Sequence, residues 1–456
     1  MKNIFISDFL FFFNHFLLLF IFLLWKMTHL QEILKLVKKH ENWRKNCINL
    51  IASENIASPL VRKALATDFG HRYAEGFLGG MDENTGLKIF NRYYQGTKYY
   101  DKIEAIAIKL AEELFECDHA NVVPISGVIA NMTAYIALAN HGDKITALSL
   151  ADGGHISHCN VSAAGVLGLK HVPYAFDTEE MNIDVDKSKK IVLKEKPKIM
   201  LFGASVFLFP HPVKEMKEVA DEVGAKIVYD AAHVLGLIAG KKFQDPFREG
   251  ADVVTSSTHK TFPGPQGGIV LCKEELAEKI DNAAFPRLTS NHHLHRVVAL
   301  AISLIEMMEF GKEYAAQIIK NAKKLAQSLY ERGFEVLCEH KDFTESHQIL
   351  VDVSKVGKGK KVAELCESAN IILNKNLLPW DSVKDAANPS GIRIGVQEVT
   401  RLGMKEKDME NIAELMERLI LKNENPKIIK TEVLELMSDF MEIKYCFSNF
   451  DFVNFE

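Results

Sequence analysis

A lysine and an aspartate in this chain stand where their side chains could do chemistry together. Lys260 follows the apolar run of residues 251–254, which predicts a buried parallel strand, and a loop rich in glycine and proline comes directly after it. The carboxyl ends of strands in an α/β sheet are where such folds place their chemistry. A partly desolvated lysine amine loses its proton more easily and can form a Schiff base. On its own, however, Lys260 is also explained as a surface lysine in a turn.

Asp230 favours the catalytic interpretation of Lys260 over that of a surface lysine. It ends a second apolar run, residues 226–229, one strand–helix–strand step before Lys260. Pyridoxal phosphate requires this pairing, because a lysine holds the cofactor and a carboxylate keeps its pyridine nitrogen protonated, so that the ring can accept electrons. Together, the two residues favour a pyridoxal-phosphate enzyme.

Composition excludes several other classes of protein. The chain has 456 residues, 47% of them hydrophobic and 25% charged, which is ordinary for a globular protein with a large and a smaller domain. A net charge of −5, without a long basic stripe, gives no reason to expect nucleic acid. The seven cysteines are odd in number and lack CxxC spacing, which argues for a reducing compartment, taken as the cytoplasm, and against a disulfide framework.

The first 26 residues do not resemble the rest of the chain. Their unbroken apolar part, residues 16–25, is too short to span a bilayer, and no small-residue cleavage site follows it. Thr28 and Gln31 form a capping-box pattern that predicts the start of an amphipathic helix. We therefore expect residues 1–26 to be an extension that does not belong to the native protein, and we expect no association with a membrane.

The order of predicted helices and strands indicates two domains. Between about residues 100 and 285 they alternate, which predicts an α/β fold with a mostly parallel sheet covered by helices on both faces. A long helix over 296–332 is then followed by short strands and helices, typical of a smaller α+β domain. The predicted divisions are an extension (1–26), an N-terminal segment (27–75), a large cofactor-binding domain (76–295), a small C-terminal domain (296–444) and a tail (445–456).

Eight motifs in order resemble the serine hydroxymethyltransferase family. They are NLIASEN (49–55), HRYAEG (71–76), RYYQG (92–96), DGGHISH (152–158), YDAAHVLG (229–236), STHKTFPGPQGG (257–268), NKN (374–376) and SGIRIG (390–395). The resemblance covers about residues 40–435 and implies a fold-type I architecture, similar to aspartate aminotransferase, with pyridoxal 5'-phosphate as the cofactor.

The resemblance implies a role for each residue around the cofactor ring. Lys260 would form the Schiff base and Asp230 would pair with the ring nitrogen. His155 would stack on the ring, and the two glycines before it allow the backbone to approach a flat group closely. His233 would point at the phenolic oxygen or at the substrate carboxylate. As an alternative, His155 could merely complete a turn.

The cofactor phosphate is expected at the start of the helix predicted over 127–139. Ser126 and Gly127 there offer free amide groups and the positive end of the helix dipole. The resemblance adds cofactor contacts from Ser205 and Ser257 and a phosphate-side contact from His259. Simple helix capping would also explain Ser126, and the others could be polar residues at strand ends.

Arg393 is the candidate for binding the carboxylate of an amino acid substrate. A guanidinium group matches a carboxylate at two points, which fixes orientation as well as charge. Ser53 is implied as a second contact to the same carboxylate. Without the resemblance, Arg393 would be interpreted as part of a surface ion pair.

Four further residues are implied to act across a homodimer with shared active sites. Tyr73 and Glu75 would reach into the neighbouring subunit, where Glu75 handles the proton of the serine hydroxyl, a task for a carboxyl group that can be neutral near the working pH. Tyr94 would lie near the reacting carbon, with Tyr93 beside it. The alternative is aromatic packing at a dimer interface.

Three stretches depart from the family pattern. Gln266 stands where bacterial relatives carry arginine, residues 285–293 replace a glycine-rich turn, and residues 385–389 replace the loop of folate-binding members. The first two differences affect the expected contacts to the cofactor phosphate, and the third affects the identity of the pterin carrier. A pterin pocket is implied at Leu150, Gly154 and Ile156. We expect an archaeal-type enzyme that uses a modified pterin such as tetrahydromethanopterin, with tetrahydrofolate as the alternative carrier.

The histidines at 292, 293 and 295 are not expected to bind a metal, because close neighbours in a loop seldom present a tetrahedral set of ligands.

The predicted reaction is the reversible transfer of the hydroxymethyl carbon of serine to a reduced pterin, which leaves glycine. Carbon–carbon cleavage and direct displacement of the hydroxyl both fit. The alternatives are a carrier-independent aldolase acting on threonine or other β-hydroxy amino acids, and a non-catalytic homologue.

Overall fold

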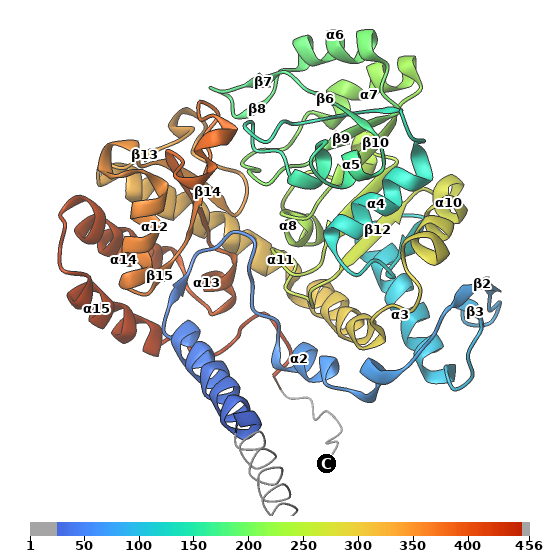
Figure 1. Cartoon of the computed structure of the whole chain (residues 1–456), viewed down its shortest axis with the longest axis horizontal. Helices are drawn as coiled ribbons and strands as arrows, with labels where there is room; N and C mark the ends of the chain where they lie inside the picture. Colours follow the sequence, from blue (N-terminus) through green and yellow to red (C-terminus); the bar gives the residue numbers. More distant parts are fainter. Residues whose placement is uncertain (1–24, 449–456) are drawn as a thin grey trace, which may run out of the picture.

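A seven-stranded sheet forms the centre of the larger part of the chain (Figure 1). The computed structural model describes residues 25–448. In this sheet the strand order is β4-β12-β11-β10-β9-β5-β6, and only β12 is antiparallel to its neighbours. The strands are β4 (His119–Asn121), β5 (Lys144–Ala147), β6 (Lys170–Pro173), β9 (Ile199–Phe202), β10 (Lys226–Asp230), β11 (Val253–Ser257) and β12 (Gly268–Cys272). The prediction of a mostly parallel sheet is confirmed.

Each central strand is buried on both faces, as expected for a parallel sheet covered by helices. In β9, Ile199 and Leu201 enter one hydrophobic cluster, whereas Met200 and Phe202 enter the other. The first cluster is covered by α4 (Gly127–Leu138), α5 (Ala163–Val166) and α10 (Ala277–Asn282). The second cluster is covered by α3 (Lys98–Phe115), α6 (Val185–Glu195), α7 (Val213–Val223) and α8 (Leu235–Ala239).

The smaller part of the chain follows α11 (Leu294–Glu331), which runs from the large sheet into it (Figure 1). Its sheet is antiparallel, in the order β13-β14-β17-β16. The strands are β13 (Glu335–Val336), β14 (Gln348–Asp352), β16 (Asn374–Asn376) and β17 (Gly391–Gly395), and the helices are α12 (Lys358–Ser368), α13 (Gln397–Arg401), α14 (Glu406–Met416) and α15 (Pro426–Ser438). The predicted division at residue 295/296 therefore falls at the beginning of α11.

The N-terminal segment joins both parts of the chain. Strand β1 (Ile48–Asn49) pairs in parallel with β15 (Ile371–Ile372) of the smaller part. Helix α2 (Pro59–Leu65) then begins as predicted, since the Ser58 hydroxyl accepts a hydrogen bond from the Val61 amide at 3.2 Å. A hairpin of β2 (Gly76–Met81) and β3 (Lys88–Arg92), which the sequence pattern did not predict, follows it.

The predicted start of the first helix at Thr28 is wrong. The helix covers residues 25–45 of the described chain, so residues 25–27 are already helical. Its apolar residues do not pack on the body of this chain: Leu30, Ile33 and Leu34 are 48%, 57% and 60% exposed, and the helix projects away from the rest (Figure 1). Among the residues that the structure describes, no helix is long and apolar enough to cross a membrane. The predicted extension lies almost wholly outside the described residues.

A close backbone contact sets the spacing of two central strands where they end. Gly203, directly after β9, has a φ of +111°. A Cβ atom on this residue would lie only 2.2 Å from the carbonyl oxygen of Asp230 at the end of β10. The Gly203 amide also donates a hydrogen bond to Nδ1 of His211 at 3.0 Å. Glycine at 203 therefore allows β9 to end directly beside Asp230.

We predict that Gly203→Ala lowers the free energy of unfolding by about 3 kcal/mol, because the added methyl group meets backbone atoms in a positive-φ conformation. Gly224→Ala is the matched control: Gly224 also has a positive φ, +68°, but a Cβ atom added there would have no atom within 4 Å of it. This control should lose only about 1 kcal/mol. Urea denaturation followed by circular dichroism measures both, and equal losses would contradict the steric argument.

Candidate active site

A cavity of about 200 Å³ opens where β9, β10 and β11 end and α4 begins. Most of the predicted cofactor residues line it together: Ser126, Gly127, His155, Asp230, His233, Ser257, His259 and Lys260. Asn131, Val128, Ala204 and Ala232 complete the lining. The parallel strands bring these side chains to one edge of the sheet although they are far apart in sequence.

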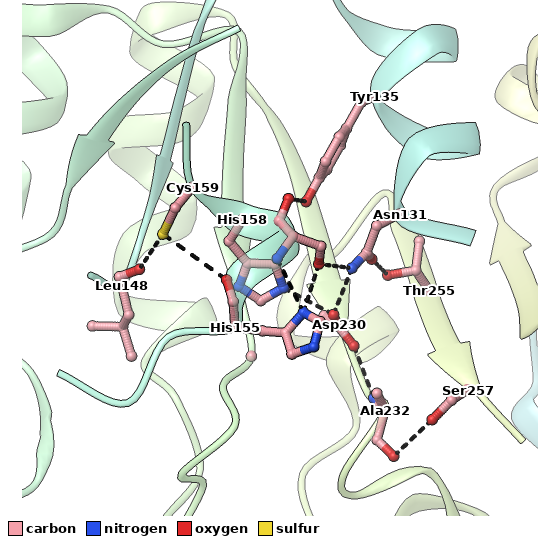
Figure 2. Close-up of polar contacts among 12 residues, drawn as sticks. Asn131, Tyr135, Leu148, His155, His158, Cys159, Asp230, Ala232, Thr255 and Ser257 are labelled. Atoms are coloured by element: carbon pink, nitrogen blue, oxygen red, sulfur yellow. Dashed lines mark hydrogen bonds and ion pairs between the residues drawn. The ribbon is translucent and has the colours of Figure 1, made fainter. Parts of the chain in front are cut away.

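Three hydrogen bonds hold the Asp230 side chain at this edge (Figure 2). Its Oδ2 accepts hydrogen bonds from Nε2 of His158 at 2.9 Å and from the Asn131 amide at 2.8 Å. Its Oδ1 accepts one from the backbone N–H of Ala232 at 2.9 Å. Burial alone would raise the pKa of this carboxyl, but the bond and charge of His158 hold that pKa well below its usual range. Asp230 is therefore a buried carboxylate that stays ionised.

Two of these partners are not predicted by the sequence pattern. His158 lies in the DGGHISH motif without an expected role, and its ring is fully buried. Asn131 lies one turn into α4, and its amide also donates to the Ser157 hydroxyl and accepts from the Thr255 hydroxyl. The sequence signal that could have indicated its role is an asparagine in a largely apolar helix, because an amide that becomes buried there needs hydrogen-bond partners.

Lys260 meets the requirement for a nucleophilic amine. Its Nζ donates a hydrogen bond to the Ser257 hydroxyl at 2.8 Å, and its carbonyl accepts one from the Asn55 amide at 2.6 Å. Burial lowers the pKa of Lys260 to about 8, against an opposing influence from the Asp230 carboxylate. The amine is therefore uncharged in a much larger fraction of molecules near neutral pH than an exposed lysine would be.

His155 and His259, two of the three histidines that line the cavity, are neutral rings near neutral pH. Burial, reinforced by the neighbouring His158, lowers the pKa of His155 to about 4, and its Nδ1 lies 2.7 Å from the Ser157 hydroxyl. Burial also lowers the pKa of His259 to about 4, and its Nδ1 is buried without a hydrogen-bond partner in the described chain. A neutral ring such as His155 can lie against an aromatic cofactor without carrying a charge.

Pyridoxal phosphate fits the side chains that are present. Ser126 caps α4, where the backbone N–H groups of the first turn point outward, as a phosphate requires. A Cβ on Gly127 would come within 3.2 Å of Ser257, so glycine keeps this corner open. The unpartnered Nδ1 of His259 adds a polar atom beside Lys260, and Asp230 supplies the anion for a protonated ring nitrogen.

Arg393 lies on β17, close enough that its charge lowers the pKa of Lys260. It is 8% exposed, and it donates hydrogen bonds to the Ser205 carbonyl oxygen at 2.5 Å and to Oδ1 of Asn374 at 3.3 Å. No carboxylate of the described residues lies within ion-pair distance of it, and burial lowers its pKa to about 10. The alternative of a surface ion pair for Arg393 is therefore wrong, and the guanidinium can receive an anion.

Ser53 belongs to a segment that lies along the end of β17. The Leu50 carbonyl accepts a hydrogen bond from the Gly395 amide at 2.8 Å, and the Ala52 carbonyl lies 3.1 Å from Nε2 of His347. Ser53 is therefore brought near the strand that carries Arg393. Ser205 contributes its carbonyl oxygen to Arg393.

The residues expected to act across subunits lie away from this cavity. Glu75 accepts a hydrogen bond from the Ser290 hydroxyl and lines a different hollow, with Phe77 and Phe285. Tyr73 and Tyr94 are 53% and 43% exposed, with their rings 5.3 Å apart. Tyr93 is 64% exposed and lies edge-on to Phe77. Within one chain these four side chains do not reach Lys260.

The positions implied for a pterin lie beside the cavity rather than in its lining. Ile156 is 51% exposed, Leu150 is half-buried and Gly154 is packed against the carbonyl of Leu148. Gln266 is exposed, and residues 385–389 lie around the end of a short helical turn, Val383–Ala387.

One grouping of histidines has the spacing of a metal site. In residues 25–448, His155, His158 and Asp230 are the one group whose potential ligand atoms lie within 4.8 Å of one another. The hydrogen bond between His158 and Asp230 accounts for two of its members, and Nδ1 of His155 lies 2.7 Å from the Ser157 hydroxyl. His292 is buried against the Tyr100 hydroxyl at 2.6 Å and His293 is exposed, whereas His295 lies in the first turn of α11 and not in a loop.

Comparisons with known proteins agree with this geometry. The family model described as serine hydroxymethyltransferase matches residues 27–416. A serine hydroxymethyltransferase from Methanocaldococcus jannaschii is 57% identical over 419 residues, which cover 91% of this chain and 95% of the relative. Proteins of the same name from Methanothermobacter marburgensis and Archaeoglobus fulgidus are 56% and 51% identical, over 91% and 93% of this chain and 95% and 94% of their own lengths.

We predict that the rate at which the chain binds pyridoxal phosphate covalently rises about tenfold per pH unit below pH 8 and levels off above it. The reason is that Lys260 loses its proton as the pH rises through its lowered pKa of about 8. Stopped-flow absorbance measures this rate. Asp230→Asn removes a charge that raises this pKa, so the plateau should begin at lower pH. A rate that keeps rising towards the ordinary lysine pKa of about 10.4 would contradict the assignment.

Proposed function

Since the chain belongs to the serine hydroxymethyltransferase family, we propose that it catalyses the reversible conversion of L-serine to glycine, with transfer of the one-carbon unit to a reduced pterin. It is a pyridoxal-phosphate-dependent enzyme of fold type I. The observation that carries the proposal is the placement of the Lys260 amine and the ionised Asp230 carboxylate on one cavity.

The side chains divide the work by their charge. Bound pyridoxal phosphate would supply an electron sink for the carbon from which a bond is broken. Asp230 would hold a proton on the ring nitrogen through Oδ1, which still has an acceptor site free beside its bond to Ala232. His155 would lie against the ring, while Ser126, Gly127, Ser257 and His259 would hold the phosphate end.

Arg393 is the residue that would position the substrate. Arg393 would bind the serine carboxylate through two parallel hydrogen bonds, with Ser53 as a further donor. Its contact with the Ser205 carbonyl aims the guanidinium before substrate binds, which lowers the entropic cost of orientation. The Lys260 amine, whose pKa burial lowers to about 8, is partly neutral near that pH and can take and return a proton as substrate enters and product leaves.

A homodimer with shared sites is part of the proposal. Glu75 and the exposed tyrosines Tyr73, Tyr93 and Tyr94 form a surface that cannot serve this chain's own cavity. In a symmetric pair, the same surface of each chain would complete the cavity of its partner. Glu75 would then act on the serine hydroxyl, with Tyr94 beside the reacting carbon.

The proposed carrier is a modified pterin such as tetrahydromethanopterin, held near Leu150, Gly154 and Ile156. The replaced loop at 385–389 supports this choice over tetrahydrofolate.

A cytoplasmic location fits the seven free cysteines, five of them buried and two half-buried.

We predict that the purified holoenzyme converts serine to glycine at a rate that depends on the added carrier, with tetrahydromethanopterin preferred over tetrahydrofolate in direct competition. Lys260→Ala should abolish turnover while the fold, followed by circular dichroism, is retained. Equal rates with and without a carrier would instead indicate an aldolase. A clear preference for tetrahydrofolate would contradict the assignment of the carrier alone.

Mixing two inactive variants tests the shared site. Glu75→Gln and Lys260→Ala would each be inactive, but a mixed dimer would contain one intact site that combines Lys260 of one chain with Glu75 of the other. After joint refolding we expect about a quarter of the wild-type activity, because half of the dimers are mixed and each has one good site. No recovery, with dimers confirmed by native mass spectrometry, would place both residues in the same chain's site.

A further inference from the structure

Gln348 is a fully buried polar side chain that no part of the mechanism above uses. It is the first residue of β14, in the smaller part of the chain, and its amide reaches loops of the larger part. Its Oε1 accepts a hydrogen bond from the backbone N–H of Phe207 at 2.8 Å, and its Nε2 donates one to the backbone carbonyl of Ser205 at 3.1 Å. Because a backbone N–H can only donate and a backbone carbonyl can only accept, the orientation of this amide is fixed.

The orientation of this amide determines the protonation of a neighbouring ring. Nε2 of Gln348 lies 2.8 Å from Nδ1 of His233. An amide nitrogen is a donor only, so Nδ1 of His233 must be the acceptor and can carry no proton. The other neighbour of Nδ1 is also a donor: Nε2 of His347, 3.5 Å away, carries a proton that it shares with the Ala52 carbonyl at 3.1 Å.

We infer that Gln348 is a positioning residue that holds His233 in its neutral Nε2–H form, so that this N–H is presented as a hydrogen-bond donor at the cavity. His233 lines that cavity together with Lys260, and no described residue bonds to its Nε2. A doubly protonated ring is excluded by the same contact, because an Nδ1–H would face the N–H groups of the amide. The role in the reaction rests on the proposed function, whereas the protonation of the ring does not.

The surroundings of His233 favour the same neutral state. Burial lowers the pKa of His233 well below its ordinary value, and the charges of Lys260 and Arg393 lower it further. His347 and His155 are the other titratable groups facing the ring, and burial holds both of them neutral. Asp230, the carboxylate that lines the same cavity, is occupied by His158 and Asn131.

A fixed N–H donor suits an oxygen that carries or gains negative charge during the reaction. Such oxygens would be the phenolic oxygen of the cofactor or the carboxylate of the substrate. If the proton were on Nδ1 instead, Nε2 would present a lone pair to that oxygen and would repel it. Gln348 would therefore contribute to the reaction without touching any reacting group, in the way that a second residue fixes the tautomer of a catalytic histidine.

The test is ¹⁵N NMR of the chain labelled at histidine, without cofactor, with the His233 signals assigned by their loss in His233→Asn. In the wild-type chain, Nδ1 should show the shift of an unprotonated nitrogen and Nε2 that of a protonated one. In Gln348→Glu, which offers an acceptor to Nδ1, a proton should appear on Nδ1. A proton on Nδ1 of the wild-type chain, or an unchanged pattern in Gln348→Glu, would overturn the inference.

The holoenzyme provides the second readout. Gln348→Met removes the donor at similar volume, and serine turnover should fall about tenfold at constant cofactor content, the cost of losing one good hydrogen bond. Gln244→Met is the control, since Gln244 is also buried and bonds backbone groups of His211 but no ring nitrogen; it should lose stability and keep its turnover. Equal losses of turnover would reduce Gln348 to a structural role. Inactive wild-type protein with the expected NMR pattern would refute the proposed function alone.

Discussion

The site depends on keeping one carboxylate ionised inside the protein. A buried charge is costly unless hydrogen bonds replace its lost water, and Asp230 has three such bonds, from His158, Asn131 and Ala232. These donors come from three different elements, so the charge is stable only when the loop after β5, helix α4 and the end of β10 are all in place. Conversely, the ionised Asp230 offers each of these polar groups a partner. The correct fold and the chemistry thus require the same contacts.

The sequence predicts those features of the site whose interacting residues are close together in the chain, and it misses those whose partners are far away. Lys260 and Asp230 were found because each follows an apolar run, and the cap at Ser58 was found because its partner is three residues away. Asn131 and Gln348 were missed because their partners are about a hundred residues distant, and nothing local marks a buried amide as bonded. The helix start was wrong because a capping-box pattern cannot stop a helix when residues 25–27 also favour it. Family resemblance supplied the proposed roles of Glu75 and Tyr73, which no local pattern in one chain would indicate.

The two parts of the chain meet at the site through polar contacts that aim side chains. Arg393 and Gln348, on neighbouring strands β17 and β14, both donate to the carbonyl oxygen of Ser205 in the larger part. This one oxygen therefore holds both Arg393, the proposed substrate-binding cation, and Gln348, the amide proposed to orient His233. A shift of the smaller part would disturb both at once, so substrate orientation and the protonation of His233 are coupled by geometry.

The charges of Lys260 and Arg393 make the region around the cavity favourable for anions. Burial lowers the pKa values of both Lys260 and Arg393, and Asp230, the carboxylate that lines the cavity with Lys260, is already bonded to His158 and Asn131. Each cation therefore retains part of its desolvation cost in the free chain. A phosphate and a substrate carboxylate bring negative charge to this region and would lower that cost, and any ligand that binds only the folded state stabilises it. Binding of these anions would therefore stabilise the folded chain at Lys260 and Arg393, the groups proposed to hold cofactor and substrate.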